Sequence, residues 1–265
     1  MVASETDTRR ATHRESEILQ VLGGAGSGRI QDLAHELGVS EETIRRNVRR
    51  LEARGLVTRV HGGVVLKGWV EEPSFTQRFA ENPAAKGKVA RHLAAMIPDG
   101  ASLFLDVGST TAYVAQALRG HRNLFVVTNS LPVAQTLATT NGNRVFMAGG
   151  ELRSHDGGAF GAEALAFVQQ FRVQYAVLSV VGITAEEGFL LHDLREAEFS
   201  RAIIRCAQQA VIAADATKFG RWAPIRIADP GAIGTVVTEA PPPPDIAAML
   251  AGAGVRVVLA EGEAT

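Results

Sequence analysis

The stretch that most constrains this chain is residues 38–66, GVSEETIRRNVRRLEARGLVTRVHGGVVL. Ser40 is a favourable helix N-cap, and the two glutamates that follow it suit the positive end of a helix dipole. Three apolar residues then recur at helical spacing, namely Ile44, Val48 and Leu51. Because this spacing places them on one side of a helix, the stretch predicts an amphipathic helix that ends at Gly55.

A β-hairpin is expected directly after this helix. Two runs rich in β-branched residues flank a His-Gly-Gly turn, at Leu56–Val60 and Val64–Lys67. Before the helix we expect a disordered tail over residues 1–13, a helix over Arg14–Leu22, a glycine-rich break over Gly23–Gly28, a helix over Ile30–Leu37 and a three-residue turn. Two helices joined by a short turn and followed by a hairpin predict a winged helix-turn-helix, whose second helix enters the DNA major groove.

Basic charge is concentrated on the same stretch. Residues 43–67 contain seven Lys and Arg residues and a single acid, Glu52, whereas the whole chain has a formal net charge of −1. A run of this kind is often only a solvated face. Its coincidence with a helix-turn-helix pattern favours a surface that binds nucleic acid.

The remaining composition excludes several classes of protein. No apolar run approaches the roughly 18 residues of a membrane span, and the polar N-terminus lacks the apolar core of a signal peptide. The single cysteine, Cys206, cannot form an internal disulfide and is expected to be a small buried hydrophobe. We therefore expect a cytoplasmic protein, and 265 residues are enough for two domains.

Residues 14–67 resemble the N-terminal winged helix of the DeoR family of bacterial repressors. The segment LAHELGVSEETIRRNVRRLEARGLVTRVHGG contains the helix, the wing and the HGG turn in the family's order. The resemblance implies double-stranded operator DNA as a partner. The chain departs from the family at Asn47, where Asp is usual. Because Asn removes a charge and adds two hydrogen-bond donors, the operator preference does not carry over; a neutral change at a helix flank is the alternative.

Roles at the DNA follow from position on the predicted helix and wing. Thr43 and Arg46, in the first half of the helix, are expected to reach base edges. Three arginines further along are expected to hold phosphates, namely Arg49, Arg50 and Arg54. Arg59 and His61 are expected at the DNA backbone or minor groove, with a plain turn residue as the alternative for His61. The predicted DNA-binding residues are Ser40, Thr43, Arg45, Arg46, Asn47, Arg49, Arg50, Arg54, Arg59 and His61.

From Ala84 onward the pattern alternates between helices and short apolar strands. Strands are expected over Ser102–Asp106, Leu124–Val127, Arg144–Met147, Tyr175–Ser179, Ala210–Ala214, Thr235–Val237 and Val255–Leu259. Helices are expected over Val89–Ile97, Ala112–Leu118 and Leu131–Leu137, and between most later strands. This alternation predicts an α/β domain with a mostly parallel sheet covered on both faces. The expected domains are residues 14–67 and 85–265, joined by a linker over 68–84.

Ligands of such sheets bind beyond the carboxyl ends of the strands. Small and hydroxyl-bearing residues follow several of the predicted strands, and a helix that starts with such residues suits a phosphate. The predicted ligand residues at these ends are Asp106, Gly108, Ser109, Thr110, Thr111, Thr128, Asn129, Ser130, Gly149, Gly150, Glu151, Gly182, Asp215 and Lys218. A plain turn is the alternative for each loop alone, and their number favours a binding site.

Nearly all of residues 85–259 resemble the sensor domain of the same family, which is similar in fold to ribose-5-phosphate isomerase and the CoA transferases. The resemblance implies a phosphorylated sugar or related metabolite as the effector. It also implies that Lys86 and Lys218 bind the phosphate and that Asp215 orients the ligand; a solvated surface role is the alternative for the lysines. Four stretches, AGGELRSHDGGAFG, QFR, RAII and TEAPPPP, resemble the glycerol-3-phosphate branch of the family, which implies glycerol 3-phosphate as the effector.

No catalytic, cofactor or metal site is expected. The pairs His155-Asp156 and His192-Asp193 lack a third ligand at metal spacing, and Glu196 and Arg195 are expected at the pocket rim or paired with each other. We expect a repressor, a homodimer or homotetramer, that its effector releases from DNA. The alternatives are a sugar-phosphate isomerase-like enzyme with an accessory DNA-binding domain, and a constitutive DNA-binding protein with a vestigial sensor.

Overall fold

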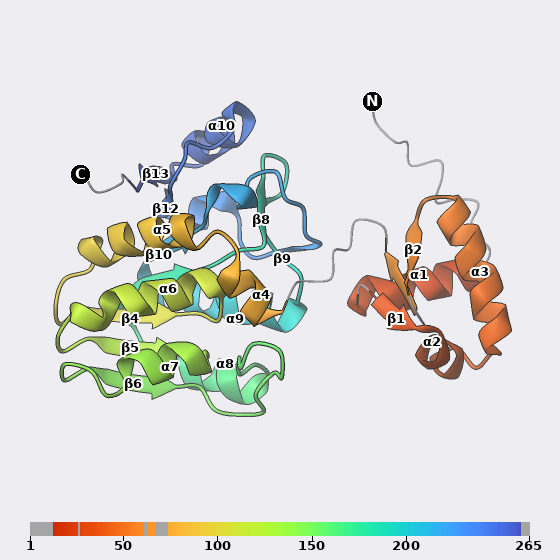
Figure 1. Ribbon diagram of the computed structural model, residues 1–265, viewed down its shortest axis with the longest axis horizontal. Coiled ribbons are helices and arrows are strands. Elements are labelled where there is room, and N and C mark those ends of the chain that lie inside the picture. The colour runs from red at the N-terminus through yellow and green to blue at the C-terminus, as the bar shows by residue number, and fades with distance from the viewer. Residues whose placement is uncertain (1–12, 26, 61–62, 67–73, 261–265) are drawn as a thin grey trace. The chain divides into compact units, whose positions relative to one another are not determined.

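A computed structural model describes residues 13–25, 27–60, 63–66 and 74–260 (Figure 1). The chain divides into two compact units, Met1–Glu72 and Pro73–Thr265. The tail predicted over residues 1–13 lies outside the described residues except for His13, and so does the predicted wing residue His61. Within the described ranges, no helix combines the length and the apolar character needed to cross a membrane.

The first unit is a winged helix-turn-helix. In chain order its described elements are α1 (His13–Ala25), β1 (Ser27–Arg29), α2 (Ile30–Glu36), α3 (Glu41–Ala53), β2 (Val57–Val60) and β3 (Gly63–Leu66). The strands pair antiparallel in the order β1-β3-β2. The predicted apolar stripe is fully buried in one core that α1 and α2 share, since Ile44, Val48 and Leu51 all have 0% exposure. The helix, turn and hairpin pattern is thereby confirmed.

The glycine-rich break predicted over Gly23–Gly28 is wrong. Helix α1 continues to Ala25, and Ser27–Arg29 forms β1, which pairs antiparallel with β3. Three residues with a glycine at their centre show no apolar alternation. This strand exists because β3 supplies its partner, which is a tertiary effect.

The linker predicted over residues 68–84 is wrong in its second half. Helix α4 (Phe75–Ala80) and the start of α5 (Pro83–Met96) lie within it. A capping box begins α4, in which Ser74 Oγ accepts a hydrogen bond from the Gln77 N–H at 3.3 Å and the Gln77 side chain accepts one from the Ser74 N–H at 3.0 Å. The Ser-x-x-Gln spacing of this box was an available sequence signal for a helix start.

A seven-stranded sheet organises the second unit. Its strands are β4 (Ser102–Leu105), β5 (Phe125–Thr128), β6 (Arg144–Met147), β7 (Val173–Leu178), β10 (Ala207–Ala213), β12 (Thr235–Thr238) and β13 (Arg256–Leu259). They lie in the order β13-β12-β10-β7-β4-β5-β6, and every neighbouring pair is parallel. The predicted parallel sheet is therefore confirmed, with each expected strand present.

Helices cover both faces of this sheet. Leu103 and Leu105 of β4 pack with α5, α6 (Ser109–Ala117) and α7 (Leu131–Leu137). Figure 1 shows these three helices on one face of the sheet. Phe104, between them, packs on the opposite face with α8 (Ala162–Val168), α9 (Leu194–Arg205) and α10 (Pro244–Gly252). Cys206 is buried in this second core, as predicted. Because both faces are covered, the central strands β4 and β5 are almost entirely buried, whereas the edge strands β6 and β13 are partly exposed.

A small antiparallel sheet was not expected. It consists of β11 (Ile225–Arg226), β9 (Gly188–Leu191) and β8 (Gly182–Thr184). Gly182 therefore lies outside the main sheet, and a Cβ at this position would stand 1.8 Å from the Arg221 carbonyl oxygen. Close backbone packing accounts for the glycine at this position, and the ligand role of Gly182 stays a prediction.

Substitutions of two leucines of the same sheet should lower the stability of the protein by different amounts, because one leucine lies on a buried central strand and the other on an edge strand. Leu103 on β4 has 0% exposure, whereas Leu259 on the edge strand β13 is 44% exposed. We expect Leu103→Ala to lower the free energy of unfolding by roughly 2–5 kcal/mol, and the control Leu259→Ala by about 0.5 kcal/mol. Chemical unfolding monitored by circular dichroism measures both, and equal losses would contradict the described burial.

Candidate functional site

Helix α3 begins with the predicted cap. Ser40 Oγ accepts a hydrogen bond from the Thr43 N–H at 3.3 Å and lies 3.0 Å from the Thr43 hydroxyl oxygen. Ser40 is exposed and Thr43 is half-buried. Both predicted DNA-binding residues therefore lie at the start of α3, which is the end that contacts base edges in helix-turn-helix proteins.

Three of the predicted DNA-contacting arginines form an exposed face on α3, and they are Arg46, Arg49 and Arg50. The buried stripe of the same helix lies on the other side. Within the described part of the chain, no carboxylate pairs with any of these three guanidinium groups. Their charge is thus available to phosphates of DNA.

The other three predicted arginines are held by acids of the same unit. The ion pairs are Arg45–Glu41 at 2.6 Å, Arg54–Glu15 at 3.0 Å and Arg59–Glu52 at 2.6 Å. The Glu15 side chain is only 4% exposed, so Arg54 neutralises a buried carboxylate and joins α1 to the end of α3. Arg59 likewise ties β2 to α3. These pairings give Arg54 and Arg59 structural tasks that the sequence analysis missed.

Asn47 does not belong to the exposed face of α3. Its side chain is 4% exposed, and Nδ2 donates a hydrogen bond to the Thr43 main-chain carbonyl at 2.8 Å. Asn47 follows Ile44 by three residues and precedes Leu51 by four, which is the spacing of the buried stripe. This spacing was the available sequence signal that Asn47 is buried. The prediction that Asn47 contacts DNA is therefore corrected: its amide is used inside the unit.

In the second unit, the loop after β4 leads directly into α6. Both carboxylate oxygens of Asp106 accept the Ser179 N–H, at 3.1 and 3.3 Å, and Asp106 is only 3% exposed. Gly108 is the N-cap of α6, and a Cβ there would stand 2.0 Å from Ser179 Oγ. Among the described side chains, none caps the first N–H groups of this helix. A helix start of this kind suits an anion.

Polar side chains of this loop are packed inward. Ser109, Thr110 and Thr111 are each 5% exposed or less. Thr111 Oγ1 donates to the Asp106 and Gly108 carbonyls at 2.9 and 3.1 Å, which fixes the turn. The Thr111 side chain is thus used within the loop, and the ligand role predicted for these three residues stays a prediction.

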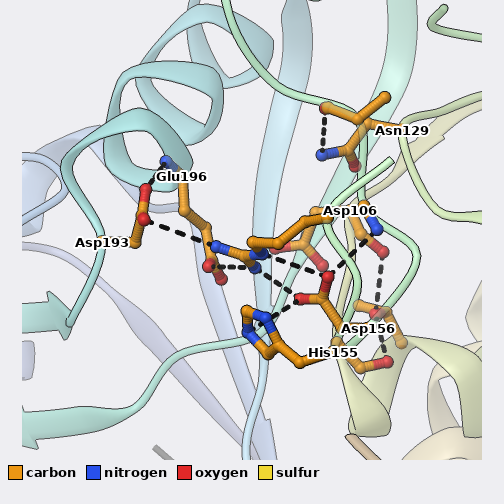
Figure 2. A network of polar contacts seen from close by, with 11 residues as sticks. Asp106, Asn129, His155, Asp156, Asp193 and Glu196 are labelled. Carbon is orange, nitrogen blue, oxygen red and sulfur yellow. Dashed lines mark hydrogen bonds and ion pairs between the residues drawn. The ribbon is translucent and has the colours of Figure 1, made fainter. Parts of the chain in front are cut away.

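The neighbouring strand β5 ends in three buried polar residues. Thr128 Oγ1 donates to the Leu105 carbonyl at 2.6 Å, and Ser130 caps α7 by accepting the Val133 N–H at 3.4 Å. Asn129 has 0% exposure, and its Nδ2 donates to the Ala159 carbonyl at 3.2 Å. Its Oδ1 has no hydrogen-bond partner among the described residues. Asn129 directly follows β5, and Figure 2 shows it in the same view as Asp106.

The loop after β6 contributes a half-buried arginine that the predicted set lacked. Arg153 donates to Asp156 through Nε at 3.1 Å and through Nη2, and also to Glu196 Oε2 at 2.8 Å. Asp193 Oδ2 lies 3.6 Å from Arg153 Nη1. Figure 2 shows Asp193 and Glu196 of α9 on one side of this network and His155 and Asp156 on the other. The available signal was an arginine three residues beyond Gly150, in the loop that follows β6.

Burial and charge in this network shift three pKa values. Burial raises the pKa of Asp106 well above its ordinary value, and the nearby Glu196 carboxylate raises it further. Burial alone would lower the pKa of Arg153, but the hydrogen bond to Asp156 and the charge of Glu196 raise it. Burial opposes ionisation of Asp156, yet Arg153 lowers its pKa overall. Arg153 is thus charged, and Asp106 is held close to a second acid.

A cavity of about 290 Å³ opens beside this network. Its lining includes Glu151, Arg153, Asp193 and Arg195. Glu196 pairs with Arg153, so the predicted pairing of Glu196 with Arg195 is not the one formed. Gly149, Gly150 and Glu151 are exposed at the mouth of the loop. The cavity is large enough for a small metabolite.

Across the sheet, the loop after β10 holds Asp215, which is 1% exposed. Its Oδ1 accepts the Thr217 N–H at 3.1 Å and the Thr217 hydroxyl, while its Oδ2 has no partner among the described residues. Lys218 ends the 3-10 turn Ala216–Lys218 that follows. The predicted pair of Asp215 and Lys218 is therefore brought to the carboxyl edge of the sheet.

Lys86 is not a surface charge. It is 2% exposed, and its Nζ donates to the main-chain carbonyls of Arg78 and, at 2.8 Å, Glu81. Burial lowers the pKa of Lys86, while the charge of Asp215 opposes the shift. The alternative of a solvated role is wrong for Lys86, and its ammonium is used by the end of α4.

No group of three or more His, Cys, Asp and Glu side chains within the described ranges is placed to hold a metal ion. His155 Nε2 lies 3.8 Å from Asp156 Oδ2, which is itself bonded to Arg153.

Comparison with known families gives matches to both units. Residues 14–68 match a DeoR-like helix-turn-helix domain, and residues 81–240 match a DeoR C terminal sensor domain. Together the two matches span the winged helix and most of the seven-stranded sheet.

Two curated proteins match this chain over more than 90% of its length and of their own. The chain is 36% identical to the glycerol-3-phosphate regulon repressor of Escherichia coli over 91% of this chain and 96% of that protein. It is 33% identical to the HTH-type transcriptional repressor CsqR of Escherichia coli over 95% and 96%.

Among solved structures, ribose 5-phosphate isomerase A from Methanocaldococcus jannaschii is similar over 53% of this chain and 56% of that chain. The sequence identity is 14% and the TM-score is 0.39, so the similarity says nothing about function.

The exposed arginine face predicts a specific change in salt dependence. Arg50→Ala should weaken binding to all DNA alike, because phosphate contacts carry no sequence information. It should also make the slope of log K against log salt shallower by about 0.9. Anisotropy titrations with a labelled duplex at several salt concentrations measure both. Arg91→Ala, an exposed arginine on α5, is the control and should leave the slope unchanged; an unchanged slope for Arg50→Ala would refute the assignment.

The Arg153 network predicts a pH-dependent stability. Because folding lowers the pKa of Asp156, its carboxylate stabilises the fold above the ordinary carboxyl pKa, and this stabilisation is lost as pH falls through the lowered value. Asp156→Asn should cost about 1.5–3 kcal/mol at pH 7, with the gap to wild type narrowing below about pH 4. Asp229→Asn is the control, since Asp229 is 85% exposed. A gap for Asp156→Asn that is constant from pH 3 to pH 7, measured by urea unfolding, would instead indicate lost packing.

Proposed function

The chain belongs to the DeoR family of DNA-binding transcriptional repressors, and on this premise we propose that a small phosphorylated metabolite releases it from operator DNA. We propose glycerol 3-phosphate as the first candidate for this effector. The main support is the similarity to the glycerol-3-phosphate regulon repressor, which extends through both units and not only through the winged helix.

The carboxyl edge of the sheet offers complementary groups to such a ligand. The uncapped first turn of α6 and the Lys218 ammonium suit a phosphate. Two buried acceptors without a partner among the described residues, Asn129 Oδ1 and Asp215 Oδ2, suit the hydroxyl groups of a polyol. Buried acceptors are nearly always bonded in proteins, so a ligand that donates to them is favoured.

Release from DNA follows from a change in equilibrium between two arrangements of a symmetric oligomer. A dimeric helix-turn-helix protein binds half-sites about 34–36 Å apart. An effector that prefers an arrangement with another spacing lowers operator affinity, and only by the ratio of its affinities for the two arrangements. We propose a homodimer or homotetramer on these grounds.

The same site is proposed to retain its ligand without turnover. A general base needs a carboxylate that is free to accept a proton, whereas Glu196 is bonded to Arg153 at 2.8 Å. Incubation of the purified protein with triose, pentose and hexose phosphates tests this point. Product above background would favour the alternative of a sugar-phosphate isomerase-like enzyme.

The role of Lys218 predicts a separation of the two activities. Lys218→Ala should bind operator DNA as wild type does, while its Kd for glycerol 3-phosphate rises about tenfold, as expected for the loss of about 1.4 kcal/mol of binding energy. Lys88→Ala is the matched control, because Lys88 is exposed on α5. Calorimetry measures effector binding and anisotropy measures release from the operator.

Two results would count against this proposal. Loss of operator binding by Lys218→Ala would contradict a role confined to the sensor. The absence of a thermal or calorimetric response to glycerol 3-phosphate, alongside a response to a hexose or pentose phosphate, would replace the effector and leave the rest intact.

A further inference from the structure

Helix α4 is the first described element of the second unit, and residues 67–74 join it to the wing strand β3. It has only six residues, yet a complete capping box of Ser74 and Gln77 fixes its start. A helix this short is marginal on its own in water. Its position must therefore depend on the contacts it makes with the rest of the unit.

The carboxyl end of α4 is held by Lys86. The buried ammonium donates to the carbonyls of Arg78 and Glu81, which are among the last carbonyls of the helix and its cap. Such carbonyls have no partner within the helix and carry the negative end of its dipole. A buried lysine that is satisfied in this way attaches α4 firmly to α5.

The junction between α4 and α5 also reaches the loop after β10. Asn82, which has a left-handed φ of 49°, places its Nδ2 3.5 Å from both Asp215 Oδ1 and Thr217 Oγ1. Asp215 belongs to the proposed effector site. The end of α4 is thus in contact with one side of that site.

Phe75 at the start of α4 and Phe79 near its end make two further contacts within the second unit. The Phe75 N–H donates to the His155 carbonyl at 3.4 Å, and His155 adjoins Asp156 in the Arg153 network. The Tyr113 hydroxyl of α6 donates to the Phe79 carbonyl at 3.1 Å, and the two rings stack with centroids 4.6 Å apart. Helix α4 therefore touches the loop after β6 and the helix that follows β4, while Asn82, between α4 and α5, reaches the loop after β10.

We propose that α4 couples occupancy of the effector site to the winged helix, with Lys86 as the positioning residue that joins them. This inference rests on the proposed function, since it describes how that site is read out. A ligand at the carboxyl edge changes the two loops and the helix that hold α4, and α4 is the described element of this unit that lies nearest in sequence to the winged helix. The sequence resemblance assigned Lys86 to the phosphate; the geometry assigns it to the helix that leads to the DNA-binding unit.

The test separates effector binding from its consequence for DNA. The double variant Ser74→Ala/Gln77→Ala removes the capping box through two exposed side chains that lie outside the effector site. Tyr113→Phe removes the bond to Phe79 and keeps the ring stacking. Gln170→Ala, which removes an exposed hydrogen bond just after the end of α8, is the matched control.

Each full-length variant is measured in two ways with glycerol 3-phosphate as the probe. Calorimetry without DNA gives the effector Kd, and anisotropy gives the ratio of operator Kd values with and without saturating effector. Coupling ratios of about 5–150 are typical of allosteric proteins. We expect the capping-box variant to keep the effector Kd within about threefold while its coupling ratio falls about fivefold or more, with a smaller fall in Tyr113→Phe and none in Gln170→Ala.

Three outcomes would overturn this inference. A wild-type coupling ratio in both α4 variants would remove α4 from the pathway while leaving the proposed function intact. An effector Kd that rises more than about tenfold in the capping-box variant would make α4 part of the binding site itself. A wild-type protein that binds glycerol 3-phosphate without any change in operator affinity would remove both the proposed function and this inference.

Discussion

Burial of both faces of the parallel sheet is the constraint on which the second unit depends. The alternate residues of β4 show it, since Leu103 and Leu105 pack under α5, α6 and α7 while Phe104 packs under the helices of the other face. Polar chemistry is then restricted to the strand ends. That restriction explains why loops from β4, β5, β6 and β10, far apart in the chain, all contribute to one candidate site.

Charges at this edge are buried, and each is compensated by a different kind of partner. Taking an ion out of water costs several kcal/mol, so a charge without a partner would not persist there. Arg153 is matched by carboxylates, and Lys86 by main-chain carbonyls. The first arrangement joins a loop to α9, and the second joins α4 to α5. The bonds that compensate these charges are thus the same bonds that fix the loop and the helix in place.

Helices and strands that follow from a local sequence pattern were predictable. The side-chain partners that lie far apart in the sequence were not. The spacing of Ile44, Val48 and Leu51 was sufficient for α3, and β-rich runs were sufficient for the seven parallel strands. Arg153 also bonds to Glu196 on α9, which is 43 residues further along the chain, and no periodicity in the sequence indicates this pairing. Asn47 and the capping box of α4 differ from these cases, because the sequence held a readable signal for both. The strands β8, β9 and β11 have two to four residues each, too few for a pattern.

The contacts that hold α4 use its own backbone almost throughout. Lys86 bonds to the carbonyls of Arg78 and Glu81, Tyr113 bonds to the carbonyl of Phe79, and the N–H of Phe75 bonds to His155. Backbone atoms are the same in every residue type, so these bonds do not depend on which side chains α4 carries. The side chains that hold the helix through them, Lys86 and Tyr113, belong to α5 and α6. The attachment of α4 is therefore encoded largely in its neighbours.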